Sequence, residues 1–266
     1  LWKEPCRDFG HRQGSSFVVV RATRCSCCVG TMPLMGTTTD ELLHELTRAG
    51  VRPGDEVIVP SYGTSEAAEA VLLAGARPVF VDIDAHSYCI DPAAVAEALT
   101  PRTAAVVAVH TFGHPADMAA LTALGRRHGV LVIGHGAVRE PAGEILRRQA
   151  NAAYLDGKLR GVLTPAVAPG VEHTYQQYVV RVPGNGRPDR DAFARTLRSR
   201  GVVCHVPVQT PAHRTARFRR DLWLAETERA ADECLALPVD PAMSRRELQR
   251  VVSACNALGG LLQSAA

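Results

Sequence analysis

Lysine, long apolar runs and a strong charge of one sign are all scarce in this sequence. Only Lys3 and Lys158 among its 30 basic residues are lysines, so a reaction that needs a lysine amine can use only these two residues. No apolar run approaches the roughly 20 residues of a membrane-spanning helix, which predicts no membrane partner. The net charge of +3 and the aromatic content of 5% likewise predict no nucleic-acid partner.

Several sequence motifs of other protein classes are also missing. There is no glycine-rich phosphate loop of the Walker or Rossmann type, no internal repeat and no low-complexity tract. The N-terminal region has no sustained apolar stretch of the secretory kind, so we expect a cytoplasmic protein. The chain begins with Leu1 rather than Met, which indicates a fragment, a processed product or an unusual start.

The eight cysteines do not form a metal-binding pattern. The segment Cys25-x-Cys27-Cys28, with Cys6 and His11 upstream, has neither the Cys-x-x-Cys spacing nor a second pair. It is interpreted as an incidental cluster, and no metal site is predicted. The remaining cysteines sit singly in apolar segments, as buried thiols do in a reducing compartment: Cys89, Cys204, Cys234 and Cys255.

What is present is an ordinary globular composition with a clear α/β pattern. Apolar residues make up 46% and charged residues 21% of the 266 residues. Residues 1–35 show no helical period and are predicted to be a poorly ordered lead segment. From residue 36 onward, short valine-rich runs alternate with helical patterns. The predicted strands are 57–59, 79–83, 104–109 and 130–133, and this alternation predicts a parallel sheet covered on both faces.

The second half of the chain has a different pattern. A long helix is predicted over 144–160, followed by a strand over 175–182, a helix over 189–200 and a strand over 202–206. A helix over 225–235 and a capping box of Ser244 and Glu247 before the last helix complete it. We therefore expect a large domain over 36–143 and a small α+β domain over 144–266.

Specific sequence motifs now point to a family. They are "GDEVIVPSY" at 54–62, "PVFVDID" at 78–84, "HTFGHPADM" at 110–118 and "LALPVDPAMSRRELQRVV" at 235–252. Over residues 36–262 the chain resembles the DegT/DnrJ/StrS family. The resemblance implies a pyridoxal-phosphate (PLP) transferase of fold type I, related to aspartate aminotransferase. It also implies transamination of nucleotide-linked sugars in amino-sugar, polysaccharide or antibiotic-sugar biosynthesis.

The resemblance assigns cofactor positions that this sequence has changed. The family's phosphate-binding segment matches residues 37–42, which makes Thr38 and Thr39 vestigial phosphate contacts, with Thr38 in place of a glycine. Thr64 falls where the family often has a ring-stacking aromatic residue. His135 stands where the family has the carboxylate that holds a proton on the pyridine nitrogen, and imidazole lacks that negative charge. We predict that His135 is an exposed loop residue.

The segment that should carry the cofactor lysine is absent. Family members continue through further strands to a Ser-x-x-Lys motif, whereas this chain passes from His135 almost directly into the helix at 144–160. Lys158 and His135 remain as weak catalytic candidates, and Lys158 is predicted to be a surface lysine. The shortened large domain is expected to keep four or five strands and to leave one sheet edge uncovered.

A basic loop is the remaining candidate. His205, His213 and Arg214 lie in a segment that faces the active site in the family, so the resemblance implies contact with a nucleotide-sugar diphosphate. The alternative interpretation is a solvated basic loop.

Three functions remain open from the sequence. The first is a family member that cannot transaminate alone. The second is an active aminotransferase, or a dehydratase using the aminated cofactor, with a rearranged or partner-supplied site. The third is a non-enzymatic partner that dimerises with a full-length relative. We accordingly expect either a homodimer or such a heterodimer.

Overall fold

The fold was analysed in a computed structural model. It describes residues 31–32, 39–136 and 140–262, with the side chains of 31–32 and 259–262 left out of the description. The predicted disorder of the lead segment and the cluster of Cys25, Cys27 and Cys28 therefore lie outside the described residues, except that Thr31 and Met32 form a short strand. The prediction of a poorly ordered lead segment over residues 1–35 stays a prediction.

The elements follow one another in two runs. The first run contains β1 (Thr31–Met32), α1 (Thr39–Arg48), β2 (Glu56–Pro60), α2 (Glu66–Leu73), β3 (Arg77–Val81), α3 (Pro92–Ala98), β4 (Thr103–Val109), a 3₁₀ turn η1 (Thr111–Gly113), α4 (Met118–His128) and β5 (Leu131–His135). The second run contains α5 (Ala142–Lys158), β6 (Tyr178–Arg181), α6 (Arg187–Ser199), a 3₁₀ turn η2 (Ala212–Arg214), α7 (Ala225–Glu233), β7 (Cys234–Leu237) and α8 (Arg245–Leu262).

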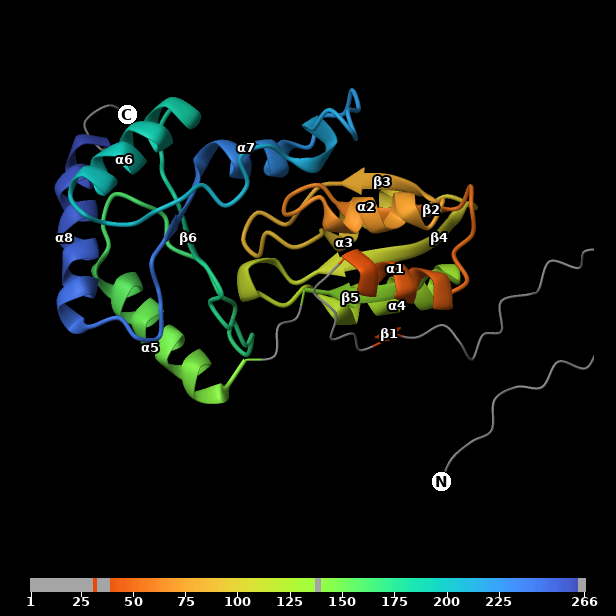
Figure 1. Ribbon diagram of the computed structural model, residues 1–266, viewed down its shortest axis with the longest axis horizontal. Coiled ribbons are helices and arrows are strands. Elements are labelled where there is room, and N and C mark those ends of the chain that lie inside the picture. The colour runs from red at the N-terminus through yellow and green to blue at the C-terminus, as the bar shows by residue number, and fades with distance from the viewer. Residues whose placement is uncertain (1–30, 33–38, 137–139, 263–266) are drawn as a thin grey trace, which may run out of the picture.

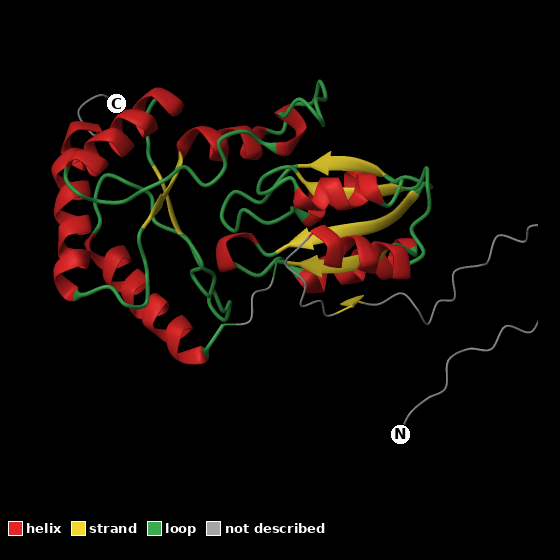
Figure 2. Cartoon of the chain, viewed as in Figure 1, coloured by secondary structure: helices red, strands yellow, loops and turns green. Residues whose placement is uncertain are grey.

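The first run forms a five-stranded sheet in the order β1-β5-β4-β2-β3, and every pair in it is parallel. Parallel neighbours require a crossover between strands, and a helix follows β2, β3 and β4 before the next strand begins. Figure 2 shows this sheet with helices on both of its faces. The predicted α/β architecture and strand number are confirmed.

Alternate residues of the strands enter two separate cores. On one face, Val57, Val59 and Val107 pack with α1 and α2. On the other face, Ile58 and Val106 pack with α3 and α4. Because successive side chains of a strand point to opposite faces, an uninterrupted apolar strand is what a sheet covered on both faces requires.

The second run builds a smaller α+β unit, seen in Figure 1 beside the parallel sheet. Its antiparallel pair, β6 and β7, packs with α5, α6 and α8 around one apolar core. One of its segments also enters the first unit, because Ala212, Phe218 and Leu224 lie in the core shared with α1 and α2. The division of the chain near residue 143 stays a prediction, and this segment crosses it.

The predicted capping box is confirmed, and one predicted strand is wrong. Asp91 caps α3 by accepting from the amide of Ala93, and Ser244 and Glu247 form the predicted capping box, with the Ser244 amide donating to Glu247 at 2.7 Å. The predicted strand over 202–206 is absent, because His205 makes only an isolated bridge to Ala236. The residues that pair with β6 instead are 234–237, which the sequence pattern assigned partly to a helix.

The edge of the sheet beside β5 is nearly bare. Beyond β5, the described residues place only the two of β1, which pair with Val132 and Ile133. The predicted uncovered edge therefore has a short strand on it. In the described residues, no helix combines the length and the apolar character needed to cross a bilayer.

Candidate functional site

A polar side chain stands at the carboxyl end of each of four parallel strands. Ser61 follows β2, Asp82 follows β3, His110 follows β4, and His135 ends β5. Ligands of open parallel sheets bind at this edge, outside the strand ends. The second unit packs against the same edge, so the two units meet where a site is expected.

His110 and His135 form the β4–β5 side of this edge. The amide of His110 donates to the carbonyl of His135 at 2.8 Å, and His110 Nδ1 accepts from the amide of Ala116 at 3.0 Å. Burial lowers the pKa of both imidazoles, and the carboxylates of Glu66 and Glu41 oppose this lowering at His135. Two uncharged imidazoles therefore stand here, and neither supplies a negative charge.

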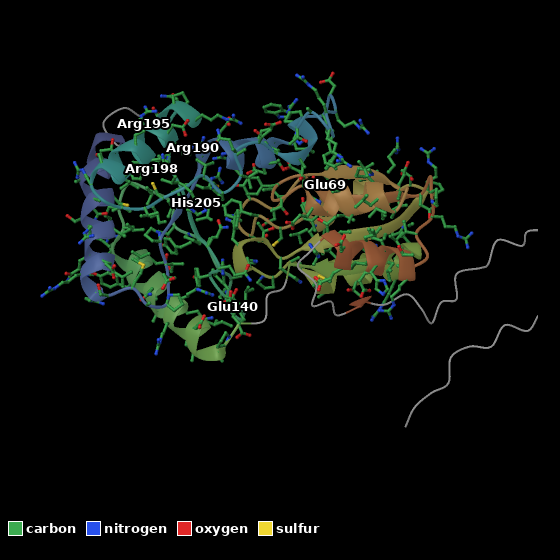
Figure 3. All side chains as sticks on the ribbon, in the orientation of Figure 1. Glu69, Glu140, Arg190, Arg195, Arg198 and His205 are labelled. Atoms are coloured by element: carbon green, nitrogen blue, oxygen red, sulfur yellow. The ribbon has the colours of Figure 1, made fainter. Side chains whose placement is uncertain are left out.

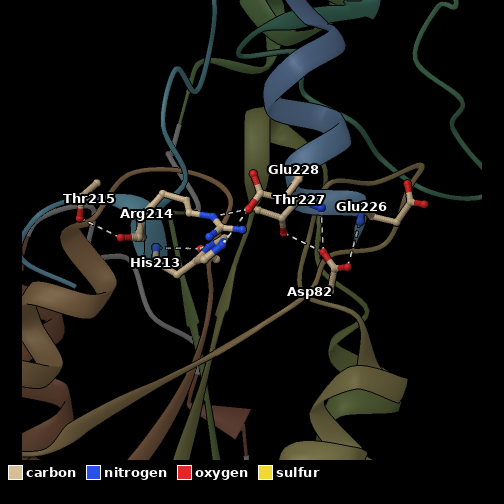
Figure 4. Close-up of polar contacts among 9 residues, drawn as sticks. Asp82, His213, Arg214, Thr215, Glu226, Thr227 and Glu228 are labelled. Atoms are coloured by element: carbon tan, nitrogen blue, oxygen red, sulfur yellow. Dashed lines mark hydrogen bonds and ion pairs between the residues drawn. The ribbon is translucent and has the colours of Figure 1, made fainter. Parts of the chain in front are cut away.

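A network of buried, hydrogen-bonded side chains lies at the end of β2, and Figure 4 shows its members His213, Arg214 and Glu228. Ser61 Oγ lies 2.6 Å from His213 Nδ1, and His213 Nε2 lies 3.0 Å from Glu228 Oε1. A carboxylate only accepts, so Nε2 carries the proton. Burial lowers the pKa of His213, and the neutral ring therefore accepts the Ser61 hydroxyl proton at Nδ1.

The network of Ser61, His213 and Glu228 resembles a hydrolytic triad in composition, but its serine and histidine are buried away from any substrate. Ser61 is 1% exposed and His213 is fully buried. The amide of His213 also donates to Ser61 Oγ at 3.1 Å, and Arg214 Nε donates to Glu228 at 2.6 Å. The network therefore ties the segment around η2 and α7 to the end of β2, rather than presenting a nucleophile.

Asp82 forms a second tie beside the first. Its carboxylate accepts from the amides of Glu226 and Thr227, at 2.9 and 2.8 Å, and from the Thr227 hydroxyl at 2.7 Å, as Figure 4 shows. These donors belong to the first turn of α7, whose amides have no partner inside the helix. A carboxylate of the sheet therefore caps a helix that is more than 140 residues away in sequence.

Three aromatic rings lie beside these two sets of hydrogen bonds, where the two units meet. Tyr62, Tyr88 and Phe112, one from each of three successive strand ends, contact one another with ring centroids 5.8 to 5.9 Å apart. Tyr88 and Phe112 hold left-handed backbone conformations, with φ of 58° and 57°. Such conformations cost free energy in non-glycine residues and persist where the surrounding packing imposes them. The packing of this cluster therefore fixes the backbone of the loops that carry the three rings.

The structure places the predicted site residues in different surroundings. His135 is 4% exposed and ends a strand, so the prediction of an exposed loop histidine is wrong. His213 is likewise buried, whereas the loop interpretation required exposure. His205 is exposed and Thr64 is exposed, with its hydroxyl donating to Glu66. Thr39 begins α1, and Thr38 lies outside the described residues.

Lys158 and Arg214 complete the set of predicted residues. Lys158 is exposed at the last position of α5, where its carbonyl accepts from Asn256 of α8. Arg214 pairs with Glu228 and lies 6.0 Å from the Trp223 ring. The structure thus joins His213 and Arg214 through one carboxylate, and it brings neither Lys158 nor His205 into that network.

These residues do not fit a covalently held PLP. Lys158 is the only lysine in the part of the chain that the structure describes, and it lies at the end of α5 in the second unit. At the strand end where the resemblance to the family predicts a carboxylate, His135 stands instead, near the acidic side chains of Glu41 and Glu66. In the described ranges, no group of three or more His, Cys, Asp or Glu side chains is placed to hold a metal ion.

Sequence reasoning missed Ser61, Asp82 and Glu228. A usable signal existed for the first two, because each is the first polar residue after an apolar strand within a quoted motif. Nothing in the spacing of Glu228 indicates its partners, since these depend on how the second unit docks.

Comparison with known proteins identifies the relatives of this chain. Residues 34–138 and 141–256 match the model of the DegT/DnrJ/EryC1/StrS aminotransferase family. The chain is 48% identical over 305 aligned positions to the UDP-N-acetyl-3-dehydro-alpha-D-glucosamine 3-aminotransferase of Acidithiobacillus ferrooxidans, covering 81% of this chain and 80% of that protein.

Solved structures give the same result. The aminotransferase TlmJ of Streptoalloteichus hindustanus superposes with a TM-score of 0.76 at 26% identity, over 86% of this chain and 85% of that one. The ntda protein of Bacillus subtilis, solved with bound cofactor PMP, shares the fold with a TM-score of 0.75 at 20% identity, over 84% of this chain and 72% of that one.

Proposed function

We propose that this chain, which belongs to the DegT/DnrJ/EryC1/StrS aminotransferase family, is unable to transaminate on its own. Its homologues are PLP-dependent sugar aminotransferases. The observation that carries the proposal is the composition of the sheet edge. His135 ends β5 where the family has a carboxylate, and the structure describes no lysine along the strand ends.

The alignment with the Acidithiobacillus protein supports this proposal. It extends over 305 positions, more than the 266 residues of this chain, yet it includes only 81% of the chain. A long gap must therefore open within this chain. The two segments that match the family model meet at residues 138 and 141, which points to the connection between β5 and α5 as the position of that gap.

The test is chemical trapping of the cofactor. The purified chain is incubated with PLP, reduced with borohydride, digested and analysed by mass spectrometry. We expect no stoichiometric pyridoxyl adduct, because the exposed Lys158 reacts no better than any surface amine. The Acidithiobacillus aminotransferase treated in parallel is the positive control. A stoichiometric adduct on Lys158 that disappears in Lys158→Ala would refute the proposal, provided that circular dichroism shows both chains folded.

A second candidate function is favoured by the edge of β5. Only two residues of β1 cover this edge among the residues that the structure describes, and bare strand edges pair readily with other chains. We propose that a full-length relative, acting on a nucleotide sugar, is the partner that covers it. Co-expression with a full-length relative from the same genome is expected to yield a heterodimer on size-exclusion chromatography. Elution of the two chains as separate species would reject this candidate.

A further inference from the structure

A small hollow lies between the two units, apart from the His135 edge and from the Ser61 and Asp82 ties. The loops after β3 and β4 form one wall, through Tyr88, Phe112 and His114, and the segment before β6 forms the other, through His173 and Gln177. Its free volume is about 10 Å³, which is close to the minimum that a single buried water molecule needs.

Hydrogen bonds fix the protonation of the two histidines in this hollow. His114 Nδ1 lies 2.8 Å from the carbonyl oxygen of Pro115, so Nδ1 carries a proton, and in the neutral ring Nε2 is an acceptor. His173 Nδ1 accepts from the amide of Tyr175 at 2.9 Å, so its Nε2 carries the proton and is a donor. Burial lowers the pKa of His173 to about 4, which keeps this ring neutral at physiological pH.

Gln177 adds a hydrogen-bond acceptor to the lining of the hollow. Its side-chain oxygen is buried and has no hydrogen-bond partner among the residues that the structure describes. The backbone of Gln177 is held in place, because its amide donates to the carbonyl of Phe112 at 3.2 Å. A buried, unpaired amide oxygen is costly, and such atoms in native proteins usually bind ordered water.

The two histidines both line the hollow, and their rings contact each other directly. Their rings meet edge to face with centroids 5.3 Å apart, and His173 stacks on Tyr175 at 4.0 Å. His173 is 6% exposed. The side chains that line the hollow therefore carry one donor and two acceptors, and the rings of Tyr88 and Phe112 line it too.

We propose that this hollow is a built binding site for one structural water molecule that joins the two units. The water donates to His114 Nε2 and to Gln177 Oε1, and it accepts from His173 Nε2. Three hydrogen bonds are the usual number for a buried water. The site also gives the unpaired oxygen of Gln177 a hydrogen-bond partner.

The first test is a crystal structure of the full chain grown without polyols. We expect a water peak about 2.7–3.2 Å from Gln177 Oε1 and from the Nε2 atoms of both histidines. In Gln177→Met, which keeps the side-chain length but removes the oxygen, we expect the peak to be lost. Gln176→Met changes the neighbouring glutamine and is expected to keep it.

A solution measurement keeps the proposal falsifiable if a variant does not crystallise. Hydrogen exchange of the Tyr175 and Gln177 amides is expected to be faster in Gln177→Met than in the wild type, and unchanged in Gln176→Met. A wild-type crystal with other ordered waters but none here would overturn the proposal. Equal exchange in all three proteins would also overturn it, because Gln177 would then act through packing alone.

Discussion

At the scale of single residues, the carboxyl edge shows how polar side chains become buried without becoming catalytic. Ser61, Asp82 and His213 are each hydrogen-bonded to partners in the other unit. Burying a polar group is tolerable only when it is hydrogen-bonded. Each of these side chains therefore contributes to the docking of the second unit, and each makes a distinct contribution that can be measured.

Ser61 is predicted to contribute to stability through its bonds to His213. Ser61→Ala removes the hydroxyl donor at Nδ1 and the acceptor of the His213 amide, leaving both buried and unpaired. We expect a loss of about 1–3 kcal/mol in the free energy of unfolding, measured by urea denaturation. Ser65→Ala is the matched control, because Ser65 bonds to Glu69 at a less buried position, and it is expected to change stability by less than about 0.5 kcal/mol. Equal effects of the two changes would contradict this role.

His173 is predicted to make the protein sensitive to acid. Its pKa is lowered from 6.5 to about 4 by burial, so between these values the unfolded state binds the proton and the folded state does not. Its stabilising contribution is therefore complete above about pH 6.5 and declines as the pH falls toward 4, by about 3 kcal/mol in total. Urea unfolding from pH 7 to pH 4 measures this decline.

The control for this pH effect is a pair of variants. His173→Asn keeps an acceptor for the Tyr175 amide but does not titrate, so we expect a smaller loss of stability on acidification. His128→Gln changes an exposed histidine and is expected to retain the wild-type pH dependence. An acid response of His173→Asn identical to that of the wild type would show that other buried histidines carry the effect.

The residue-level surprises have a common physical cause. His135 ends an apolar run and precedes a glycine, which is typical of a solvated loop, yet its side chain is buried near Glu41 of α1 and Glu66 of α2. His213 lies among arginines, which is typical of a surface segment, yet Phe218 and Leu224 anchor that segment in the core under α1 and α2. Local sequence predicts whether a segment is polar, but burial depends on residues distant in the chain.

At the scale of elements, the start of α7 depends on the sheet. The segment before this helix offers no side-chain cap of its own, and Asp82 supplies the missing acceptor from the end of β3. This explains why the sequence pattern predicts the body of the helix at 225–235 but not the reason for its start. It also explains the missed strand β7, because a short apolar run after a helix looks like its continuation until β6 is placed beside it.

Asp82→Ala is predicted to loosen α7 from the sheet. The change removes the acceptor of three hydrogen bonds that cross between the two units, and we expect a loss of about 2 kcal/mol in stability. Hydrogen exchange in the first turn of α7 should become faster. Asp117→Ala is the control, since Asp117 caps α4 within its own unit, and it is expected to cost about 1 kcal/mol and to leave exchange in α7 unchanged. Unaltered exchange in α7 of Asp82→Ala would contradict the proposed tie.

At the scale of the whole molecule, the fold class is largely predictable from the sequence, but the arrangement of strands and units is not. The valine-rich runs and the glycines that end the helices, such as Gly129 after α4, specify a parallel sheet with helices on both faces. The order of the strands, the short β1 beside β5 and the docking of the second unit involve residues far apart in sequence, and no local pattern encodes them. The proposed loss of activity follows from this larger arrangement.

If the proposed function is right, inserting the segment of the relative that falls in the alignment gap is predicted to allow covalent cofactor binding. A chimera replaces residues 137–140 with the segment of the Acidithiobacillus relative that falls in the alignment gap, and it also carries His135→Asp. The segment would bring the family's lysine, and the aspartate would return the negative charge near the pyridine nitrogen, so we expect about one borohydride-trapped PLP per chain. It should also cover the edge of β5 and reduce aggregation on size-exclusion chromatography. The same chimera with that lysine changed to alanine should trap none. A folded chimera that traps no PLP would show that the scaffold has lost more than the inserted strands and the carboxylate.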